Sequence, residues 1–471
     1  MSSNAAREFL RRAAEKSADL NHRQIIRRSV DHYDAAVRAG RSRFADWEAA
    51  RERCHEIKRD ALNNLEHYLR EFEQRIQERG GHVFWAENSA EACEYITQLA
   101  VSRGVGKVVK SKSMVAEEIH LGPALENAGI EDVDTDLGEF IVQLRHEPPY
   151  HIVTPAMHLT RKEIAVLFKE KLGDVESDDP QELVAAARRA LRKIFFSAEM
   201  GVTGVNFLVA DAGMVAITTN EGNDRLGTSL PRIHVAIAGI EKIIPRLQDL
   251  ALFWPVLATA GTGQPITCYN TLIGGPRQSN EVDGPEEFHV VLLDNGRSEL
   301  LADTEQREVL SCIRCGACLN ACPVYRTIGG HAYGTTYSGP IGSVLTPHLR
   351  GLNEFQHLSY ASSLCGACTD ACPVKIDLHH HLLENRRDAV QHASRPLMER
   401  IGFKVWRWTM QSRVRFELAG RLTRAAIRVA TAAHLNGTAL DPAGLWSQKH
   451  GPLPSPKKSF RALWGKLDGA K

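Results

Sequence analysis

The chain has 471 residues, of which 43% are hydrophobic and 24% are charged, and its formal net charge is +1. This is an ordinary globular composition; it contains no run of eighteen apolar residues, which excludes a transmembrane helix, and no apolar leader follows Met1. The length predicts about three domains, and we expect a cytoplasmic location, where thiols stay reduced.

Residues 1–79 are strongly charged and rich in helix-forming residues. Apolar side chains recur at helical spacing, as in Leu62, Leu65, Leu69 and Phe72, and Gly40 is the main interruption. We predict two or three helices that pack on the next domain or on a partner subunit.

Residues 80–296 alternate short apolar runs with amphipathic stretches, which predicts βαβ units and a mostly parallel sheet in a Rossmann-like α/β domain. Strands are predicted at 83–85, 107–110, 140–144, 204–210, 214–218 and 234–238, with a turn at 211–213 between two of them. Helices are predicted to begin at Ser89, Ser113 and Ile240, and Thr160 with Glu163 forms a capping box.

No Gly-x-Gly-x-x-Gly fingerprint and no phosphate loop is present, so a tightly bound nucleotide has no support. The polar segment 218–225 follows a predicted strand, where α/β sheets often bind ligands. It could hold a small acid through Arg225, although a plain surface turn is the alternative. Oxidation of a 2-hydroxy acid would need a general base and a cation that binds the carboxylate, roles that His and Arg side chains fill. The candidates, none of which is singled out by its spacing, are His146, His151, His158, Arg225, Arg232 and His234.

Residues 304–390 contain seven of the ten cysteines, in the spacing of two cubane-type iron-sulfur clusters. The motifs are Cys312-x-x-Cys315-x-x-Cys318-x-x-x-Cys322-Pro323 and Cys365-x-x-Cys368-x-x-x-Cys372-Pro373. In such pairs the cysteine before the proline serves the other cluster. We therefore assign Cys312, Cys315, Cys318 and Cys372 to cluster 1, and Cys322, Cys365 and Cys368 to cluster 2. The long segment between the motifs favours a helical ferredoxin-type module.

Cluster 2 is one thiolate short, because Ser362 stands where Cys312 stands in the first motif. It is either a three-iron cluster or a four-iron cluster whose last iron takes Ser362, another side chain, water or a partner's group. Cys268, which lies far outside the motifs in the sequence, is a further candidate for the fourth ligand. Structural zinc and a disulfide framework are the less favoured alternatives. Zinc needs only four ligands and does not explain the Cys-Pro endings, and a disulfide framework suits small secreted domains, whereas this chain is long.

Other residues are expected to be structural. Cys54 and Cys93 lie in helical patterns and are read as buried thiols. The run from His379 to His381 is read as a solvated or interface face, because consecutive helical residues point in different directions and cannot bind one ion together.

Residues 391–471 are predicted to form a basic helical tail, with helices from about Pro396 to Leu435. From Arg386 to the end there are 17 basic and 5 acidic residues, a local balance of +12. Together with four tryptophans, this charge could dock an acidic protein surface or an anionic membrane face. A solvated helical cap is the alternative, and nucleic acid is not the expected partner.

Several segments together resemble the iron-sulfur subunits of bacterial L-lactate utilisation systems. They are 312–323, 329–334 (Gly-Gly-His-Ala-Tyr-Gly), 337–342 and 361–368, together with 136–141, 211–214 and 221–223, which are similar to the lactate-utilisation (LUD) domain. The resemblance implies a flavin-independent oxidation of L-lactate to pyruvate by three proteins, the others being a cysteine-rich iron-sulfur protein and a second LUD-domain protein. It also implies two [4Fe-4S] clusters on the seven cysteines, although some relatives have a full second quartet where this chain has Ser362.

Three hypotheses follow. The first is an electron-transfer subunit for lactate oxidation that supports growth on lactate and passes electrons to an unknown acceptor. The second keeps that role but changes the substrate to glycolate or another 2-hydroxy acid. The third is a metabolite-binding or sensory module that its clusters merely stabilise.

Overall fold

The computed structural model describes residues 3–173, 175–392 and 397–435, and beyond them 438, 441, 444–447, 450, 451, 453, 454, 457–461, 463 and 464. The start of the predicted tail helices at Pro396 and much of the terminus lie outside these residues. The chain forms two units, Ser2–Ala393 and Ser394–Lys471, and each is described by itself.

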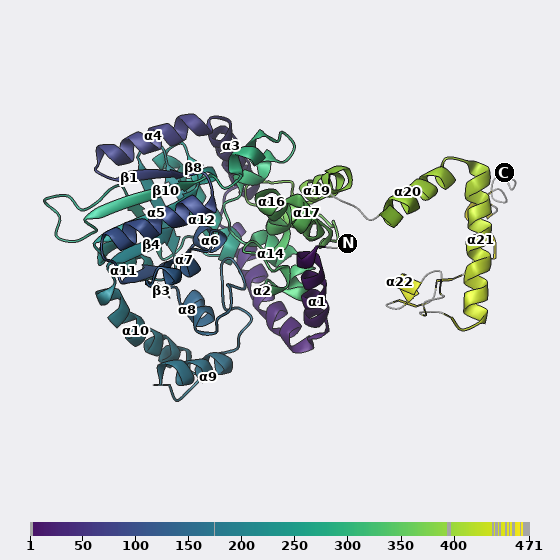
Figure 1. Cartoon of the computed structure of the whole chain (residues 1–471), viewed down its shortest axis with the longest axis horizontal. Helices are drawn as coiled ribbons and strands as arrows, with labels where there is room; N and C mark the ends of the chain where they lie inside the picture. Colours follow the sequence, from purple (N-terminus) through teal and green to yellow (C-terminus); the bar gives the residue numbers. More distant parts are fainter. Residues whose placement is uncertain are drawn as a thin grey trace. The chain divides into compact units, whose positions relative to one another are not determined.

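The N-terminal segment forms four helices, where two or three were predicted. They are α1 (Asn4–Ala18), α2 (Leu20–Arg41), α3 (Trp47–Asn63) and α4 (Leu65–Glu78). Asp19 separates the first two, because its side chain accepts a hydrogen bond from the N–H of His22 and so starts a new helix. Helix α1 lies beside the cysteine-rich segment, α2 and α3 contact both that segment and the α/β domain, and α4 lies on the α/β domain (Figure 1).

The main sheet has six strands, all parallel, in the order β1-β10-β7-β4-β2-β3. Their bounds are His82–Ala86 (β1), Lys107–Lys110 (β2), Glu131–Asp134 (β3), Met200–Gly204 (β4), Ile233–Gly239 (β7) and Glu287–Leu293 (β10). The parallel sheet is as predicted, and β1, β2 and β7 lie where strands were expected. Strands β3, β4 and β10 were not predicted; β3 contains a single apolar residue and β4 two glycines, so neither has a strand-like pattern.

One predicted strand is wrong. Residues 140–144 belong to helix α8 (Leu137–Leu144), because the Asp136 side chain accepts hydrogen bonds from the N–H groups of Gly138 and Glu139 and begins a helix there. A short apolar run does not distinguish a strand from a buried helix.

The predicted helix starts are mostly correct. Ser113 caps α6 (Met114–Glu118), and the Thr160 capping box opens α9 (Arg161–Leu172). Helix α5 (Ser89–Ser102) is capped by Asn88, one residue earlier than predicted. The predicted helix at Ile240 is only a 3-10 turn, η1 (Ile240–Lys242).

Helices cover both faces of the main sheet, which gives the three-layer α/β arrangement. Helices α5, α6 and α7 (Leu121–Asn127) cover one face, and α4, α8, α9 and α10 (Pro180–Ser197) cover the other. Alternate residues of β7 separate the two cores: Val235 and Ile237 face α5 and α6, while Ala236 and Ala238 face α4.

A second, four-stranded sheet has the order β8-β5-β6-β9. The predicted hairpin is present, since β5 (Phe207–Val209) and β6 (Met214–Thr219) pair antiparallel. Strands β8 (Ile243–Ile244) and β9 (Tyr269–Ile273) complete the sheet. Helix α11 (Asn223–Ser229) lies against β4, and α12 (Leu250–Thr262) lies against α2.

The cysteine-rich segment is helical, as predicted for a ferredoxin-type module of this kind. Its elements are α13 (Arg297–Ala302), η3 (Arg307–Ser311), α14 (Ala317–Ala321), α15 (Tyr325–Ile328), η4 (His331–Tyr333), α16 (Gly339–Arg350), α17 (Leu352–Phe355), η5 (Gln356–Tyr360), α18 (Ala367–Ala371) and α19 (Leu378–His392). Helix α14 packs beside α18, which brings the two cysteine motifs together.

The smaller unit contains α20 (Leu397–Met410), α21 (Arg413–Ala432) and the short α22 (Gly444–Ser447). Helix α20 has no buried side chain, and Phe403, Trp406 and Trp408 are all exposed. Within the described residues, none of the helices combines the length and the apolar character that crossing a bilayer requires.

Candidate iron-sulfur centres and an adjoining cavity

The two cysteine loops have the same backbone conformation. Arg314 and Leu364, each just before the second ligand position, have φ values of 60° and 54°, and the glycines that follow, Gly316 and Gly366, have 80° and 81°. Each loop continues into a five-residue helix, α14 or α18, and ends at a cysteine followed by proline. The sequence repeat is therefore a structural repeat.

Four cysteines surround one small cavity of about 20 Å³: Cys312, Cys315 and Cys318 of the first loop and Cys372 of the second. Its other walls include Ile152, Ile341 and Val374. Burial, and then the neighbouring Cys312 thiol, raises the pKa of Cys372 to about 12, and burial followed by Cys372 likewise raises the pKa of Cys315. These four thiols are the set that the sequence assigns to cluster 1.

The other three cysteines form a second group. Burial and then Cys322 raise the pKa of Cys368 to about 11, and Cys365 is a further neighbour of both. Cys365 is exposed, and a hydrogen bond from Ser363 lowers its pKa. Because Cys368 is also an electrostatic neighbour of Cys318, the two groups lie close to each other.

The surroundings of the first group suit an anionic core of iron and sulfide. Backbone N–H groups of Arg314 and Ile376 donate to the Sγ atoms of Cys312 and Cys372, each at 3.4 Å. The Arg314 guanidinium is buried, and its Nη1 has no hydrogen-bond partner among the described residues. Donors of this kind stabilise thiolate ligands and tune the potential of a cluster.

Arg314 belongs to a buried charge network. Its Nη2 lies 3.4 Å from Oε1 of Glu241, and its guanidinium lies 4.7 Å from the ring centre of Tyr337. Arg297 binds the same Glu241 at 2.6 Å and Glu118 at 2.8 Å. The network fixes the first cysteine loop to the carboxyl end of β7, because Glu241 lies two residues after that strand.

A cavity of about 670 Å³ adjoins the first cysteine loop, a size typical of ligand-binding pockets. Its lining includes residues that follow four parallel strands, together with two residues of the cysteine loop: Lys112, Asp136, Asn206, Lys242, Arg314 and Cys315. It also includes residues 218–221 and Asn223, so most of the polar segment singled out in the sequence does face a cavity. Cys315 and Arg314 line both cavities.

The six histidine and arginine candidates are not among the residues that line the large cavity. Arg225 is exposed and lies over the ring of Tyr269, and His234 is buried in β7, where it pairs with Thr203 at 2.8 Å. His151 lies beside Gly316, and burial lowers its pKa to about 3. His146 and Arg232 lie elsewhere, on a turn and before β7. The cations of the cavity, Lys112, Lys242 and Arg314, were not predicted, although Arg314 stands inside the cysteine motif.

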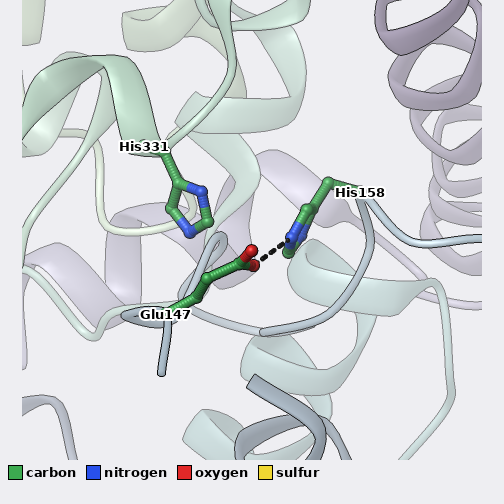
Figure 2. A group of neighbouring side chains, drawn as sticks. All are labelled: Glu147, His158 and His331. Atoms are coloured by element: carbon green, nitrogen blue, oxygen red, sulfur yellow. Dashed lines mark hydrogen bonds and ion pairs between the residues drawn. The ribbon is translucent and has the colours of Figure 1, made fainter. Parts of the chain in front are cut away.

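His158 joins a separate polar group with Glu147 and His331, shown in Figure 2. Its Nε2 pairs with Glu147 at 3.0 Å, and Nε2 of His331 pairs with the carbonyl of Pro148 at 2.8 Å. Burial lowers the pKa of His158 to about 4, so it is neutral at pH 7. These contacts fasten the loop after α8 to the Gly-Gly-His segment.

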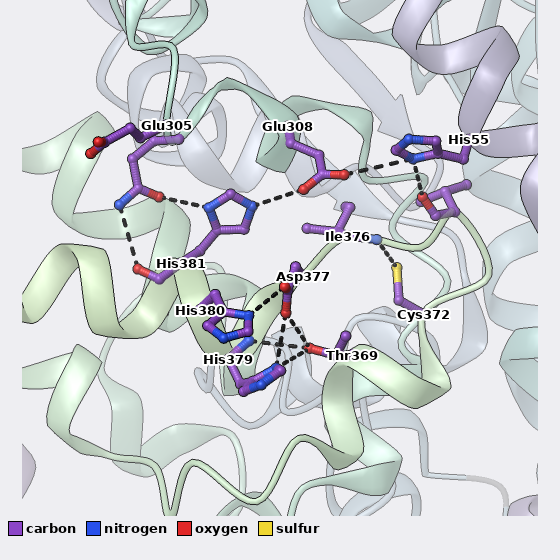
Figure 3. A network of polar contacts seen from close by, with 12 residues as sticks. His55, Glu305, Glu308, Thr369, Cys372, Ile376, Asp377, His379, His380 and His381 are labelled. Carbon is purple, nitrogen blue, oxygen red and sulfur yellow. Dashed lines mark hydrogen bonds and ion pairs between the residues drawn. The ribbon is translucent and has the colours of Figure 1, made fainter.

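Of the three consecutive histidines, His379 and His380 converge, with ring centres 4.2 Å apart, and only His381 points away, so the expected divergence holds for His381 alone (Figure 3). His381 is buried, which excludes the solvated face but not the interface face, the two alternatives expected, and it pairs with Glu308 at 3.2 Å and with Gln306. His379 and the exposed His380 both contact Asp377. Asp377 directly follows Ile376, so this network supports the turn that holds Cys372.

Two spare cysteines are placed largely as predicted. Cys54 is buried, and burial raises its pKa to about 12; Cys93 is half-buried and donates to the carbonyl of Ile119. Cys268 is exposed in the loop before β9, where its N–H donates to Asn220. It is not among the electrostatic neighbours of the second cysteine group.

Comparison with known proteins agrees with this organisation. The LUD domain profile matches residues 69–293, and the 4Fe-4S dicluster domain profile matches residues 308–376. Lactate utilization protein B from Bacillus cereus (strain AH820) is 45% identical over 443 residues, which cover 93% of each chain. The protein of that name from Bacillus thuringiensis (strain Al Hakam) is 44% identical over the same share. A DUF162 family protein from Deinococcus radiodurans, of known crystal structure, is 13% identical, covers 49% of this chain and 98% of its own, and has a TM-score of 0.27, too low to support an argument.

Proposed function

Because this chain belongs to the lactate utilization protein B family, with a LUD domain followed by an iron-sulfur-binding dicluster domain, we propose that it is the electron-transfer subunit of a system oxidising L-lactate to pyruvate. The observation that carries this proposal is the placement of the two cysteine groups. Three of the four cysteines of the first group are buried, and Cys315 also lines the large cavity, while the second group reaches the surface at Cys365. Clusters bound there would supply one-electron redox chemistry.

We assign Cys312, Cys315, Cys318 and Cys372 to one [4Fe-4S] cluster, and Cys322, Cys365 and Cys368 to a second. The shared lining of one small cavity supports the first set. The second set has three thiols, so a [3Fe-4S] cluster and a [4Fe-4S] cluster with a fourth, non-cysteine ligand both fit it.

The exposed position of Cys365 places the second group where a partner can approach it. We propose that the partners are a cysteine-rich iron-sulfur protein and a second LUD-domain protein, all in the cytoplasm, where thiols stay reduced. The basic smaller unit, with its exposed Trp406 and Trp408, provides a surface for docking an acidic partner or, peripherally, an anionic membrane face.

The test uses the full chain purified without oxygen. Iron and sulfide are counted, and EPR spectra are recorded during a redox titration and after addition of L-lactate, with and without the two partner proteins. We expect two reversible clusters that L-lactate reduces only when the partners are present.

Other outcomes separate the rival functions. Reduction by glycolate but not by L-lactate would keep the electron-transfer role and change the substrate. Clusters that resist redox cycling, with no reduction by any 2-hydroxy acid, would favour a sensory or binding module. Bound zinc in place of iron would end the proposal.

A further inference from the structure

We propose that Glu147, His158 and His331 bind one divalent transition-metal ion such as Zn²⁺, which fastens the LUD domain to the dicluster segment. The first two residues lie within the LUD domain match, at residues 69–293, and the third lies within the dicluster match, at residues 308–376. The site contains no thiol and is separate from both cysteine groups. Such an ion adds a structural role that the electron-transfer function does not require.

The three side chains come from the loop after α8 and from the start of η4, and they point toward one another (Figure 2). Each offers one ligand atom, and these atoms lie within 4.8 Å of one another. Two metal bonds of about 2.1 Å span at most about 4.2 Å, so an inward movement of about 1 Å brings the atoms onto one ion. Two imidazoles and a carboxylate suit zinc and similar metals, whereas calcium and magnesium prefer oxygen ligands.

Two of the ligands are oriented by further contacts. Nε and Nη2 of Arg145 donate to Oε1 of Glu147 at 3.0 and 2.9 Å, which leaves Oε2 for an ion. Nε2 of His331 lies 2.8 Å from the carbonyl oxygen of Pro148, an acceptor, so Nε2 carries the proton and Nδ1 is unprotonated, as metal binding requires. Contacts of this kind are typical around metal ligands, because they fix the tautomer and the orientation of each side chain.

Tyr150 holds the two imidazoles in place. Its ring stacks on that of His158, with ring centres 4.5 Å apart, and meets that of His331 edge-on at 4.9 Å. Nδ1 of His158 has no partner among the described residues, so the ring can carry its proton there and free Nε2 for an ion. Both rings are therefore positioned before any metal binds, which lowers the entropic cost of binding.

Two glycines bring His331 to this position. A Cβ on Gly329 would lie 1.5 Å from the hydroxyl oxygen of Tyr150, and a Cβ on Gly330 would lie 1.7 Å from its carbonyl oxygen. Residues without a side chain are needed for this close approach, which sets His331 beside the Tyr150 ring. The Gly-Gly-His segment thus delivers a ligand to the site.

An ion at this site stabilises a loop that forms part of both cavities. The loop from Glu147 to His158 contributes Ile152 to the small cysteine cavity and residues 152–157 to the large one. Its two ends carry two of the ligands, so the ion fixes both ends and joins them to His331. Because the assembled site exists only in the folded chain, binding should raise the free energy of unfolding.

Zinc binding is measured on the full chain, loaded with its clusters and kept free of oxygen. Elemental analysis after gel filtration is expected to give one zinc per chain in addition to the full iron content. X-ray absorption at the zinc edge should show a shell of nitrogen and oxygen without sulfur. Zinc should also raise the thermal midpoint by a few degrees.

Two variants test the ligands. Glu147→Gln keeps the size of the side chain but removes its charge, and His331→Ala removes one imidazole. We expect each to weaken zinc binding by about a hundredfold or more and to abolish the rise in thermal midpoint. The matched controls are His67→Ala and His380→Ala, at exposed histidines of α4 and α19, and both should bind zinc as the unmodified chain does.

The iron content and the thermal midpoint without zinc verify that each variant is folded and loaded; if His331→Ala is not, Glu147→Gln decides. Unchanged zinc affinity in Glu147→Gln would overturn the inference. A zinc shell that contains sulfur would do the same, because the metal would then lie on the cysteines, and so would loss of zinc in His380→Ala alone. Clusters that L-lactate does not reduce in the presence of the partners would count against the electron-transfer function and leave the metal site unaffected.

Discussion

Ser362 occupies in the second cysteine loop the place that Cys312 occupies in the first. The Oγ of Ser362 accepts the N–H of Leu364 at 3.1 Å, and the Sγ of Cys312 accepts the N–H of Arg314 at 3.4 Å. Because the flanking backbone also agrees, Ser362 stands at the position of a fourth ligand, with a hydroxyl where the first loop has a thiol.

Replacing Ser362 by cysteine should complete the second set of thiols. We expect Ser362→Cys to keep or raise the iron content and to lower the potential of the second cluster, because a thiolate adds negative charge. Iron quantitation gives the iron content, and an EPR-monitored redox titration gives the potential. Ser362→Ala is the companion variant: a large loss of iron identifies the hydroxyl as a ligand, and unchanged iron shows that it is not. Spectra and potential unaltered in Ser362→Cys would contradict the prediction.

Loss of one thiol from either group should remove one cluster signal. We expect Cys315→Ser to abolish the signal of the buried cluster and Cys368→Ser that of the other, each with about half of the iron lost, and each variant to lose lactate-supported growth. Cys268→Ser, an exposed cysteine outside both groups, is the matched control and should keep its full iron content. If Cys315→Ser instead reduced both signals equally, the grouping would be wrong.

Arg314 should raise the potential of the buried cluster. Removing its charge in Arg314→Gln is expected to cost about 2 kcal/mol of stabilisation of the reduced form, which is on the order of 100 mV for a one-electron couple. Arg314→Lys should shift the potential less, and Arg225→Gln, at an exposed arginine, should leave it unchanged. Spectroelectrochemistry gives the values; a shift confined to the second cluster would refute the assignment.

Glu221 should make stability depend on pH. Burial and then the charge of Asp136 raise its pKa from 4.5 to about 7 in the folded chain. Protonation therefore favours the folded state: this contribution is complete below about pH 4.5 and is lost as the pH rises through about 7. Glu221→Gln should be more stable than the unmodified chain at pH 8, by on the order of 2 kcal/mol.

The measurement is the denaturant midpoint of the anaerobic protein between pH 5 and 8. Glu170→Gln, at an exposed carboxylate on α9, should follow the unmodified chain throughout. An equal pH dependence in Glu221→Gln would show that another group is responsible.

Gly330 should tolerate no side chain. A Cβ there would lie 1.7 Å from the carbonyl oxygen of Tyr150, a backbone atom that has little freedom to move. We expect Gly330→Ala to destabilise the chain by on the order of 3 kcal/mol. Gly106→Ala, where nothing lies within 4 Å, should change stability by less than about 1 kcal/mol. Thermal unfolding compares the two, and similar midpoints would contradict the packing described.

The sequence by itself determined the iron-sulfur chemistry, the parallel α/β domain and the helical cysteine module. These follow from local patterns: three thiols on one loop reach one cluster because of their spacing, and strands β1, β2 and β7 have their own apolar runs. The capping box at Thr160 is equally local. Where local evidence was ambiguous, as at residues 140–144, a neighbouring cap decided the outcome.

Only the tertiary structure decided the composition of the large cavity. Lys112, Asn223, Lys242 and Arg314 come from four distant segments, and the strand order of the sheet brings them together. Strand order depends on long-range pairing, which leaves no periodic signal at any one residue. Lys242 therefore looks like any surface lysine in the sequence, and only folding buries it at the large cavity.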